Sequence, residues 1–392
     1  MSKFANEIWK SDMNIFKEAT DKFYKKELAA KDYKGISGGY GSYAQRGGES
    51  SMLRLRMSGG RVTKEKLHFL VKMIEKHKVN KVHFTTCQTI QYHNLQPAVL
   101  YNIMSEALNY DIVTRGGGGD FPRNVMVSPL SGVEKDEYFD VMPYALEASE
   151  YLMAFIKTVT LPRKLKVGFS NSDKNMPHAT FRDLGFVARV DGTFDVYSAG
   201  GLGNNPKMGL KVAEAVEPSK VLYYVKAMVQ MFIAYGNYEN RGKARTRYMQ
   251  DTLGAEGYVQ AYQKKLAEVM KEETNLDLDI VPTMITKQSD GIVVTDKRII
   301  PQKQEGLYSV WYHPIGGTPD PGKLRRIYDT IKDMEQVELR LSPDESVYII
   351  NCNGEEAKKV LQITADGANT TFEASVSCIG STICQVGVRD SQ

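Results

Sequence analysis

The sequence repeats one pattern at a constant offset, which places Gly59-Gly60 over Gly316-Gly317 without a gap. In the same alignment Lys66-Leu67 falls on Lys323-Leu324, and apolar residues recur at matching positions. The order of strand-like and helix-like patterns also agrees between the two stretches. Such agreement makes duplication of one folding unit the better interpretation. We therefore expect the chain to build the same unit twice.

Each copy predicts a strand, a helix, two further strands and a second helix. In the first copy these elements are expected at 52–57, 64–77, 82–85 and 89–93, and from Pro97. In the second copy they are expected at 307–313, from Pro321, at 337–341 and 347–350, and from Gly354. The β-α-β-β-α order makes up most of a ferredoxin-like unit, so the fold class expected is α+β with internally duplicated ferredoxin-like units.

The other segments complete the expected organisation. A charged, helix-prone arm covers 1–34, and a Gly/Ser-rich loop covers 35–51. Between the copies, an α/β region has predicted strands at 125–127, 164–169, 186–189 and 193–197 and predicted helices at 138–158, 220–235 and 258–272. The expected domains are the arm with the first ferredoxin-like unit, a first α/β lobe, a second ferredoxin-like unit and the start of a second α/β lobe, at 1–110, 111–285, 286–365 and 366–392. The second lobe is expected to be truncated, so the chain is expected to be part of a longer protein.

Composition excludes several classes of protein. The 51 basic and 47 acidic residues leave a net charge of +4, which is too small to imply a nucleic-acid partner. The N-terminus has no apolar core of a secretory signal, and the longest apolar stretch, 221–236, is interrupted by Lys226 and too short to span a bilayer. Four cysteines are too few for a disulfide scaffold. We expect a cytoplasmic protein without a membrane partner.

Two arginines mark the first strand of the first copy. Strand alternation places Arg54 and Arg56 on one face, opposite apolar residues. A solvated strand face is the ordinary explanation of such a pair. The second copy has Trp311 and His313 at these positions, so the fold of the unit does not require the basic face.

Two more basic clusters lie in the α/β region. Lys164 and Lys166 fall on one face of a predicted strand, and a further cluster follows the apolar stretch at Arg241, Lys243, Arg245 and Arg247. Like charges that are buried together repel one another unless a counter-charge lies among them. The clusters therefore point to a polyanionic ligand.

Cysteine and histidine give weaker signals. Cys378 and Cys384 form a C-x5-C pair, which would supply half of a four-ligand iron–sulfur or zinc site; buried free thiols are the alternative. Cys352 falls within a predicted strand and is expected in the core. His83 and His93 lie in the first-copy strands without metal-ligand spacing, which favours structural roles. We find neither a dinucleotide fingerprint nor a nucleophile elbow in the sequence.

The sequence resembles the nitrite/sulfite reductase family that contains siroheme and a [4Fe-4S] cluster. The resemblance runs from about residue 40 to the end and is carried by MLRLRMSGG (52–60), VHFTTCQTIQYH (82–93), GDFPRNVMVSPLSG (119–132), LPRKLKVGF (161–169), SAGGLG (198–203), NRGKARTRY (240–248) and SCIGSTIC (377–384). It implies two ferredoxin-like units that pair, each followed by an α/β lobe.

The resemblance also implies roles for individual residues. The residues that would hold the substrate over the siroheme iron are Arg56, Arg123, Lys164 and Lys166. Those that would contact the macrocycle or its carboxylates are Thr85, Gln91, Arg163 and Arg245. Cys378 and Cys384 would be the first two ligands of the [4Fe-4S] cluster. Such residues suit the chemistry, because siroheme and oxyanions are negatively charged and lysines can deliver protons.

The sequence departs from the family at two points. Cys87 stands where the family has an arginine in T-x-R-Q, and we interpret it as a packing substitution, the alternative being a reactive or ligating thiol. The family's second cysteine pair, in a C-x3-C motif, does not occur in this sequence. With two of the four expected thiolates, we expect this chain alone to be catalytically incomplete.

The predicted function is siroheme-dependent six-electron reduction of sulfite to sulfide, or of nitrite to ammonia, with sulfite preferred. The electron donor would be ferredoxin or a flavoprotein. Two alternatives remain open: a non-catalytic tetrapyrrole-binding or assembly subunit, and a cobalamin-pathway oxygenase acting on a corrin precursor.

Overall fold

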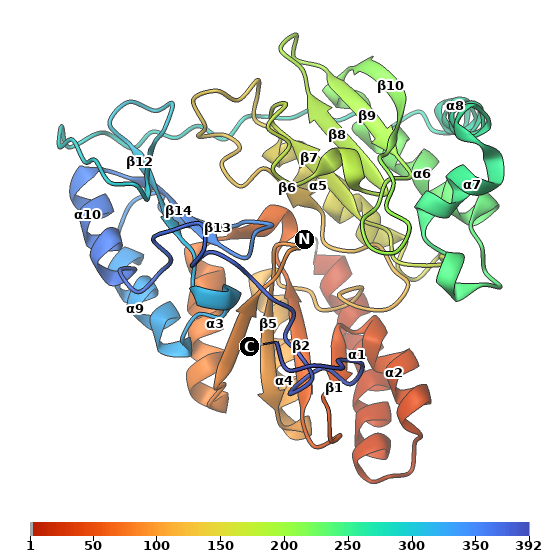
Figure 1. The fold of residues 1–392 in the computed structure, drawn as a ribbon, viewed down its shortest axis with the longest axis horizontal. Coiled ribbons are helices and arrows are strands. Elements are labelled where there is room, and N and C mark those ends of the chain that lie inside the picture. The colour runs from red at the N-terminus through yellow and green to blue at the C-terminus, as the bar shows by residue number, and fades with distance from the viewer. Residues whose placement is uncertain (1–2, 392) are drawn as a thin grey trace. The chain divides into compact units, whose positions relative to one another are not determined.

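The computed structural model describes residues 3–391. They separate into two compact units, one combining the stretch up to Gly119 with the stretch from Ile285, the other being Asp120–Met284 (Figure 1). Within the described residues, the named strands form one four-stranded and two five-stranded sheets, so the expected α+β fold is confirmed. No helix in this part of the chain is long and apolar enough to cross a membrane.

The N-terminal arm consists of α1 (Lys3–Tyr24) and α2 (Ala30–Gly39). The rings of Phe23 and Tyr33 stack between them with centroids 4.2 Å apart. The loop expected at 35–51 is wrong at its start, because α2 continues to Gly39 and β1 (Ser42–Ala44) follows. Tertiary packing overrides the low helix propensity of these glycines.

The first ferredoxin-like unit is an antiparallel sheet in the order β1-β2-β5-β4. Its remaining elements are β2 (Ser51–Arg56), α3 (Lys64–His77), β4 (Lys81–Phe84), β5 (Thr89–Leu95) and α4 (Pro97–Ala107). The Thr63 side chain caps α3 by accepting from the Lys66 amide. The predicted helix bounds at 64–77 are confirmed.

The second copy follows the same order, with its sheet arranged β11-β12-β14-β13-β3. Its elements are β11 (Ile299–Pro301), β12 (Tyr308–Tyr312), α9 (Pro321–Ile331), β13 (Glu338–Leu341), β14 (Val347–Cys352) and α10 (Gly354–Ile363). Asn353 and Glu356 form a capping box at α10, which explains the predicted helix start.

The two copies share an unusual backbone. Left-handed conformations recur at four equivalent pairs: Gly59 (φ 60°) and Gly316 (63°), Gly60 (69°) and Gly317 (67°), Gln88 (53°) and Glu345 (68°), and Asn94 (57°) and Asn351 (63°). A positive φ is uncommon for residues other than glycine, so the agreement extends the duplication from sequence to geometry.

A short strand joins the copies. β3 (Arg61–Val62) pairs with β13, where Arg61 lies opposite Arg340, and Arg61 also forms an ion pair of 2.8 Å with Glu338. The reciprocal position to Val62 in the second copy is Pro319. Proline has no backbone N–H to donate to a β-ladder. Among residues 3–391, the second copy therefore forms no strand equivalent to β3.

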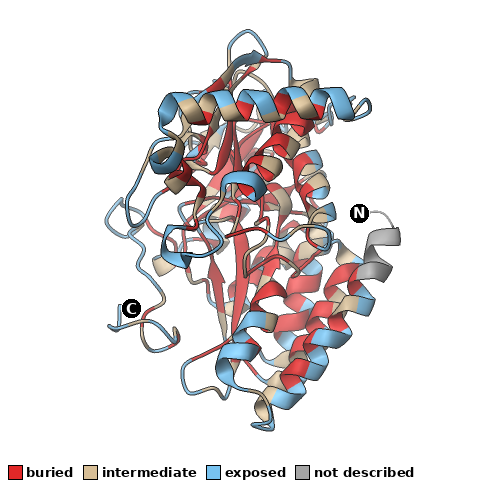
Figure 2. Cartoon of the chain, turned by 90° about the vertical axis from the view of Figure 1, so that its right-hand side faces the viewer, coloured by how far each residue is buried: buried red, intermediate tan, exposed pale blue. Residues whose placement is uncertain are grey.

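The second unit is a mixed sheet in the order β10-β9-β8-β7-β6, in which β6, β7 and β8 run parallel. Its strands are β6 (Met126–Val127), β7 (Val167–Ser170), β8 (Leu184–Ala188), β9 (Phe194–Ser198) and β10 (Leu210–Val216). Its helices are α5 (Met142–Ala154), α6 (Val221–Tyr235), α7 (Met249–Leu253) and α8 (Ala255–Glu272). Most strands are buried, β10 excepted, and α8 exposes one side, whereas α6 is buried along most of its length (Figure 2).

Short 3₁₀ helices connect many elements. They are Ser58–Gly60, Leu108–Tyr110, Ala179–Phe181, Pro218–Lys220, Arg241–Lys243, Thr246–Tyr248 and Ile315–Gly317.

Three expectations for the second unit are corrected. The helix expected at 138–158 is shorter, with Pro143 in its first turn. The strand expected at 164–169 begins only at Val167, so Lys164 and Lys166 lie in the segment before it. β10 was not predicted, because its charged residues interrupt the alternation that marks a strand.

Candidate functional site

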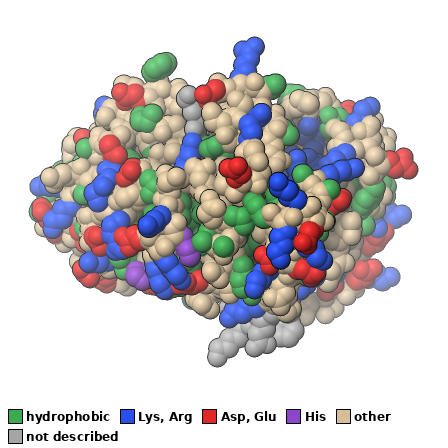
Figure 3. Space-filling view, turned by 90° about the horizontal axis from the view of Figure 1, so that it is seen from below, with side chains coloured by type: hydrophobic (Ala, Val, Ile, Leu, Met, Phe, Trp, Pro, Cys, Tyr) green, Lys and Arg blue, Asp and Glu red, His purple; other side chains and the backbone are tan. Residues whose placement is uncertain are grey.

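The outer surface offers little guidance to function. On the face shown in Figure 3, basic and acidic side chains are interspersed. Such mixing agrees with a nearly balanced charge and favours no polyanionic partner for the surface. Candidate sites therefore have to be sought among buried or half-buried charges.

In the second unit, the segment before β7 carries a group of cations. Main-chain hydrogen bonds of Leu165 fix the backbone of this segment. The Leu165 carbonyl accepts from the Arg123 amide at 2.8 Å, and the Leu165 amide donates to the Phe121 carbonyl at 3.2 Å. Arg123 and the two lysines on either side of Leu165 are therefore brought together by main-chain bonds. We call Arg123, Arg163, Lys164, Lys166 and Arg245 the lobe cations.

The lowered pKa of Lys164 shows that the lobe cations lie close together. The pKa of its ammonium group is lowered to about 7, first by burial and then by the charges of Lys166, Arg123 and Arg245. A lysine with this pKa is about half protonated at neutral pH. An anion placed beside it would favour the protonated form, as expected of a site built for a negatively charged ligand.

One buried carboxylate organises part of the group. Asp183 is fully buried and accepts from Nη2 of Arg245 at 3.1 Å and from the Lys166 amide at 2.7 Å. The Thr246 hydroxyl donates to the same carboxylate. The Nε of Arg245 is buried and has no hydrogen-bond partner among residues 3–391. Asp183 thus orients one predicted residue and the backbone of another.

A second carboxylate holds Arg163. Asp120 accepts from Nη1 of Arg163 at 2.7 Å and from Nη1 of Arg241 at 2.5 Å. Although burial alone would raise the pKa of Asp120, hydrogen bonds from Arg241 and Arg163 lower it below its ordinary value. The charge of Arg163 is therefore partly balanced within the protein.

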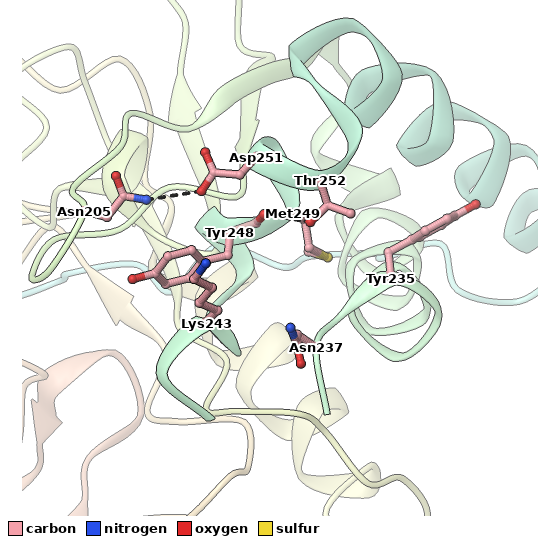
Figure 4. Close-up of a pocket in the computed structure, with 8 residues that line it drawn as sticks. All are labelled: Asn205, Tyr235, Asn237, Lys243, Tyr248, Met249, Asp251 and Thr252. Atoms are coloured by element: carbon pink, nitrogen blue, oxygen red, sulfur yellow. Dashed lines mark hydrogen bonds between the residues drawn. The ribbon is translucent and has the colours of Figure 1, made fainter. Parts of the chain in front are cut away.

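The predicted cluster at 241–247 does not act as one group. Arg241 joins Asp120, Arg245 joins Asp183, and the buried Arg247 donates to the Asn204 carbonyl at 2.6 Å. Lys243 lines a separate pocket of about 350 Å³ in which Asn205 donates to Asp251 at 3.2 Å (Figure 4). The other residues lining this pocket are Tyr235, Asn237, Tyr248, Met249 and Thr252.

The first unit contains a pocket of about 300 Å³ on the first-copy sheet. Two predicted residues, Gln91 and Cys384, are among those that line it. Polar residues that the site prediction left out also line it: Lys34, Tyr43, Gln45, Arg54 and His93. Apolar contacts come from both the sheet and the segment that carries the cysteine pair. We call this cavity the first-copy pocket.

Arg54 gives the first-copy pocket its charge. Its Nη1 donates to the Gly117 carbonyl at 2.5 Å. With the Gln91 amide turned so that its oxygen faces Arg54, that oxygen accepts from Nη2 at 2.7 Å. The structure records no carboxylate paired with Arg54 among residues 3–391. A half-buried guanidinium without a protein counter-ion fits an acidic ligand in the pocket.

His93 lies beside this arginine and stays neutral. Its pKa is lowered to about 3, first by burial and then by the charges of His83, Lys81 and Arg54. In the same orientation of Gln91, the amide nitrogen donates to Nε2 of His93 at 3.1 Å. The Nδ1 of His93 is buried and finds no partner within the described residues. The structural role expected for His93 therefore includes a place in the pocket wall.

Two other predicted residues belong to the same sheet. Arg56 is 3% exposed on β2, and its Nη1 donates to the Arg115 carbonyl at 3.2 Å. The Thr85 hydroxyl lies 2.7 Å from that of Thr89 and accepts from the Cys87 amide at 3.3 Å, so it shapes the turn between β4 and β5. Cys87 is half-buried in this turn.

The cysteine pair lies in a segment that runs against the first-copy sheet. Arg46 holds this segment through two hydrogen bonds to main-chain carbonyls. Its amide donates to the Ile383 carbonyl at 2.9 Å, and its Nη2 donates to the Cys384 carbonyl at 3.3 Å. Cys384 is half-buried and Cys378 is exposed. In the described part of the chain, no group of three or more His, Cys, Asp or Glu residues could hold a metal ion. Cys352 is buried in β14, as expected.

Asp183, Asp120 and Arg54 were missed as site residues for different reasons. Arg54 was visible as part of the basic face, but nothing distinguished it from Arg56 as a pocket residue. The two carboxylates gave no signal, because their arginine partners lie 62 and 121 residues away in the chain.

Two family models match the chain. One, described as the nitrite and sulphite reductase 4Fe-4S domain, matches residues 118–270. The other, described as the nitrite/sulfite reductase ferredoxin-like half domain, matches residues 43–110. Together they cover more than half of the sequence and correspond to the lobe and the first copy.

Individual proteins agree with these models. The chain is 26% identical over 351 residues to a chloroplastic ferredoxin–nitrite reductase of Arabidopsis thaliana, covering 85% of this chain and 58% of the relative. It is 23% identical over 390 residues to the sulfite reductase [NADPH] hemoprotein beta-component of Staphylococcus haemolyticus, covering 88% and 65%. The chain thus spans about three fifths of the length of such relatives.

A solved structure shares the fold. The Mycobacterium tuberculosis NirA protein superposes with a TM-score of 0.75 at 19% identity, covering 95% of this chain and 72% of that one. The duplicated sheets, the α/β unit and the two family models all point to the same family. The chain belongs to the nitrite and sulfite reductase family, whose members are oxidoreductases that use siroheme and a [4Fe-4S] cluster.

Proposed function

We propose that this chain binds siroheme and takes part in the six-electron reduction of sulfite to sulfide or of nitrite to ammonia. The observation that carries the proposal is the group of lobe cations, with the Lys164 pKa lowered to about 7. Cations that repel one another in the protein alone are stabilised when an anion lies among them.

The residues described above fit the cofactor. Siroheme carries eight carboxylates, and the first-copy pocket is lined by the half-buried, charged Arg54 together with Lys34 and Gln91. Arg163 and Arg245, each oriented by an aspartate, would hold further carboxylates. When bound, siroheme with its iron–sulfur partner supplies the electrons that reduce the substrate.

The lobe cations would bind the substrate and move protons. Arg123 and Lys166 attract a small oxyanion, and its charge favours protonated Lys164. The ammonium group at Nζ of Lys164 then donates its proton to a substrate oxygen as charge develops there. Arg56 would add a donor that is held by the Arg115 carbonyl. Cys378 and Cys384 would bind the cluster.

The electron donor proposed is ferredoxin. Several similar proteins carry the name ferredoxin–nitrite reductase, including those of Arabidopsis thaliana and Synechococcus elongatus. The Staphylococcus haemolyticus relative is named as an NADPH-dependent sulfite reductase component, so a flavoprotein donor is tested in parallel.

The direct test is reconstitution. The purified chain is incubated with siroheme and assayed for viologen-linked reduction of sulfite and nitrite, with Lys164→Met as the diagnostic variant. We expect a tetrapyrrole absorption band in both proteins. Because the chain carries two of the four expected cluster thiolates, it should turn over only weakly by itself. This residual turnover should fall by roughly 100-fold or more in the variant, which lacks the proton donor. Uptake of a corrin precursor in place of siroheme would contradict the proposal, and siroheme binding without reduction would favour a tetrapyrrole-binding role.

A further inference from the structure

The side chains of Arg54 and Arg56, both on the first-copy sheet, donate hydrogen bonds to the same loop. Nη1 of Arg54 donates to the Gly117 carbonyl at 2.5 Å, and Nη1 of Arg56 donates to the Arg115 carbonyl at 3.2 Å. The Arg56 amide also donates to the Val113 carbonyl at 3.0 Å. Because guanidinium groups follow the acceptors that they bond, the position of this loop sets where both arginines point.

The N-terminal arm is bonded to that loop through Arg115. Nε of Arg115 donates to Oδ2 of Asp12 on α1 at 2.9 Å, and Nη1 donates to the Gly39 carbonyl of α2 at 2.7 Å. The guanidinium also lies 4.5 Å from the ring centroid of Tyr40, whose hydroxyl donates to the Asp12 carbonyl at 2.9 Å. One side chain therefore ties the loop to both helices of the arm.

Close backbone packing makes the loop depend on the arm. A Cβ at Gly118 would lie 2.3 Å from the Gly38 carbonyl oxygen, and one at Gly41 would lie 2.6 Å from the Thr114 carbonyl oxygen. The Gly116 amide donates to the Gly39 carbonyl at 2.8 Å. The loop and the end of α2 touch through glycines, which leaves no side-chain layer to absorb a shift of the arm.

We propose that Asp12 is a positioning residue: through Arg115 it fixes the loop 114–119 and so orients Arg54 and Arg56. This role rests on the proposed function, in which these arginines face the cofactor and the substrate. Asp12 itself touches neither. The arm would then be part of the reductase site, because it decides whether two of its cations are held in place.

The ion pair suits this role. The side chains of Arg115 and Asp12 are 15% and 12% exposed, so water screens them weakly. Removing the charge of one partner leaves the other poorly compensated and free to move. Asp21 provides a matched control, because it lies exposed on the same helix and the structure records no ion pair for it among residues 3–391.

The first experiment needs no cofactor. Hydrogen exchange is measured by NMR in the full chain for the Gly116 amide and for the Nη1–H groups of Arg54 and Arg56, which bond the loop. We expect exchange to rise roughly 5- to 30-fold in Asp12→Asn, as for the loss of one or two kcal/mol, and to be unchanged in Asp21→Asn. Asp12→Glu, which keeps the carboxylate, should restore most of the protection. Unchanged exchange in Asp12→Asn would overturn the proposal.

The second experiment tests whether the Asp12–Arg115 ion pair affects anion binding at the proposed site. Siroheme-loaded proteins are titrated with sodium nitrite and with sodium sulfite, and binding is followed by the optical spectrum. We expect Asp12→Asn to weaken the affinity about tenfold at equal siroheme content and melting temperature, in line with a shift of 1.4 kcal/mol. Faster exchange with unchanged anion affinity would also overturn the proposal. If the wild-type chain takes up no siroheme, the proposed function fails, and the exchange result still decides whether Asp12 fixes the loop.

Discussion

The two ferredoxin-like copies have the same backbone and different chemistry. Arg54 and Arg56 of the first copy correspond to Trp311 and His313 of the second. Both ring nitrogens of His313 lie within 3.0 Å of backbone carbonyl oxygens, so this side chain is fully engaged within its own copy. The half-buried Arg54, by contrast, lines a pocket and has no carboxylate partner within the described chain.

This difference teaches where function is located. Left-handed residues recur at equivalent positions, and they are what the shared scaffold needs. The side chains on one sheet face are independent of that scaffold, so one copy can carry a cationic site while the other does not. Substitutions that exchange residues between the copies can therefore separate the two requirements.

The largest effect is expected at the glycine turns. In Gly60→Ala the new Cβ would lie 2.7 Å from the backbone oxygen of Leu341, whereas in Gly317→Ala it would meet the Glu345 side chain. The Glu345 carboxylate can turn away and leaves only the Glu345 Cβ, at 2.8 Å, to shift slightly, whereas the paired strand backbone at Leu341 is held in place. We expect losses of about 3 kcal/mol for Gly60→Ala and about 1 kcal/mol for Gly317→Ala in the free energy of unfolding. Urea denaturation measures both, and equal losses would mean that the two turns are not distinguished by their surroundings.

A smaller effect is expected on anion binding. Arg56→His gives the first copy the residue of the second and removes a charged donor worth about 2 kcal/mol, so nitrite or sulfite affinity should fall about 30-fold. The matched control is His313→Gln in the second copy, which should leave the affinity unchanged. Optical titration of the siroheme-loaded proteins provides the measurement. Similar losses in both variants would remove the functional distinction between the copies.

Acid stability provides a third comparison, through His93→Ile, because Ile350 is the equivalent residue. The folded-state pKa of His93 is about 3, below the ordinary 6.5, so the unfolded chain binds more protons between these values. Wild-type stability should therefore fall as pH drops through this window, by up to about 2 kcal/mol at pH 5. His93→Ile should lose this component. Unfolding free energies at pH 7 and pH 5 test it, and an unchanged difference would show that His93 is not buried neutral.

The smallest effect expected at neutral pH concerns the lobe cations. The folded-state pKa of Lys164 is about 7, below the ordinary 10.5, so stability should rise as pH rises through this interval. Lys164→Met should remove the rise and stabilise the cofactor-free chain at pH 7 by about 1 kcal/mol. Thermal unfolding across this pH range measures it. A destabilised variant would show that the cations do not repel one another.

Local signals explain what the sequence could predict. The predicted bounds of α3 and the predicted start of α10 agree with the structure, where the Thr63 cap and the Asn353–Glu356 capping box fix these helix starts locally. The expected loop at 35–51 was wrong at its start because α2 is completed by buried contacts of Ser37 and the glycines after it. Such contacts join segments far apart in the chain and leave no local pattern.

The site was predictable as a set of cations but not as an arrangement. The motifs carried Arg123, Lys164 and Lys166, which the second unit brings together. They carried neither Asp183 nor the loop that holds Arg54, because long-range hydrogen bonds define both. A basic residue in a motif indicates charge, whereas its partner depends on the whole fold.

The account depends on an acidic tetrapyrrole being held by the first copy and not by the second. The most direct measurement is an optical titration of the cofactor-free chain with siroheme, comparing Arg54→Met with Trp311→Met. We predict saturable one-to-one binding that weakens about tenfold or more in Arg54→Met, because a half-buried charged contact is lost, and that is unchanged in Trp311→Met. Equal affinities in the two variants, or no saturable binding in the wild-type chain, would contradict it.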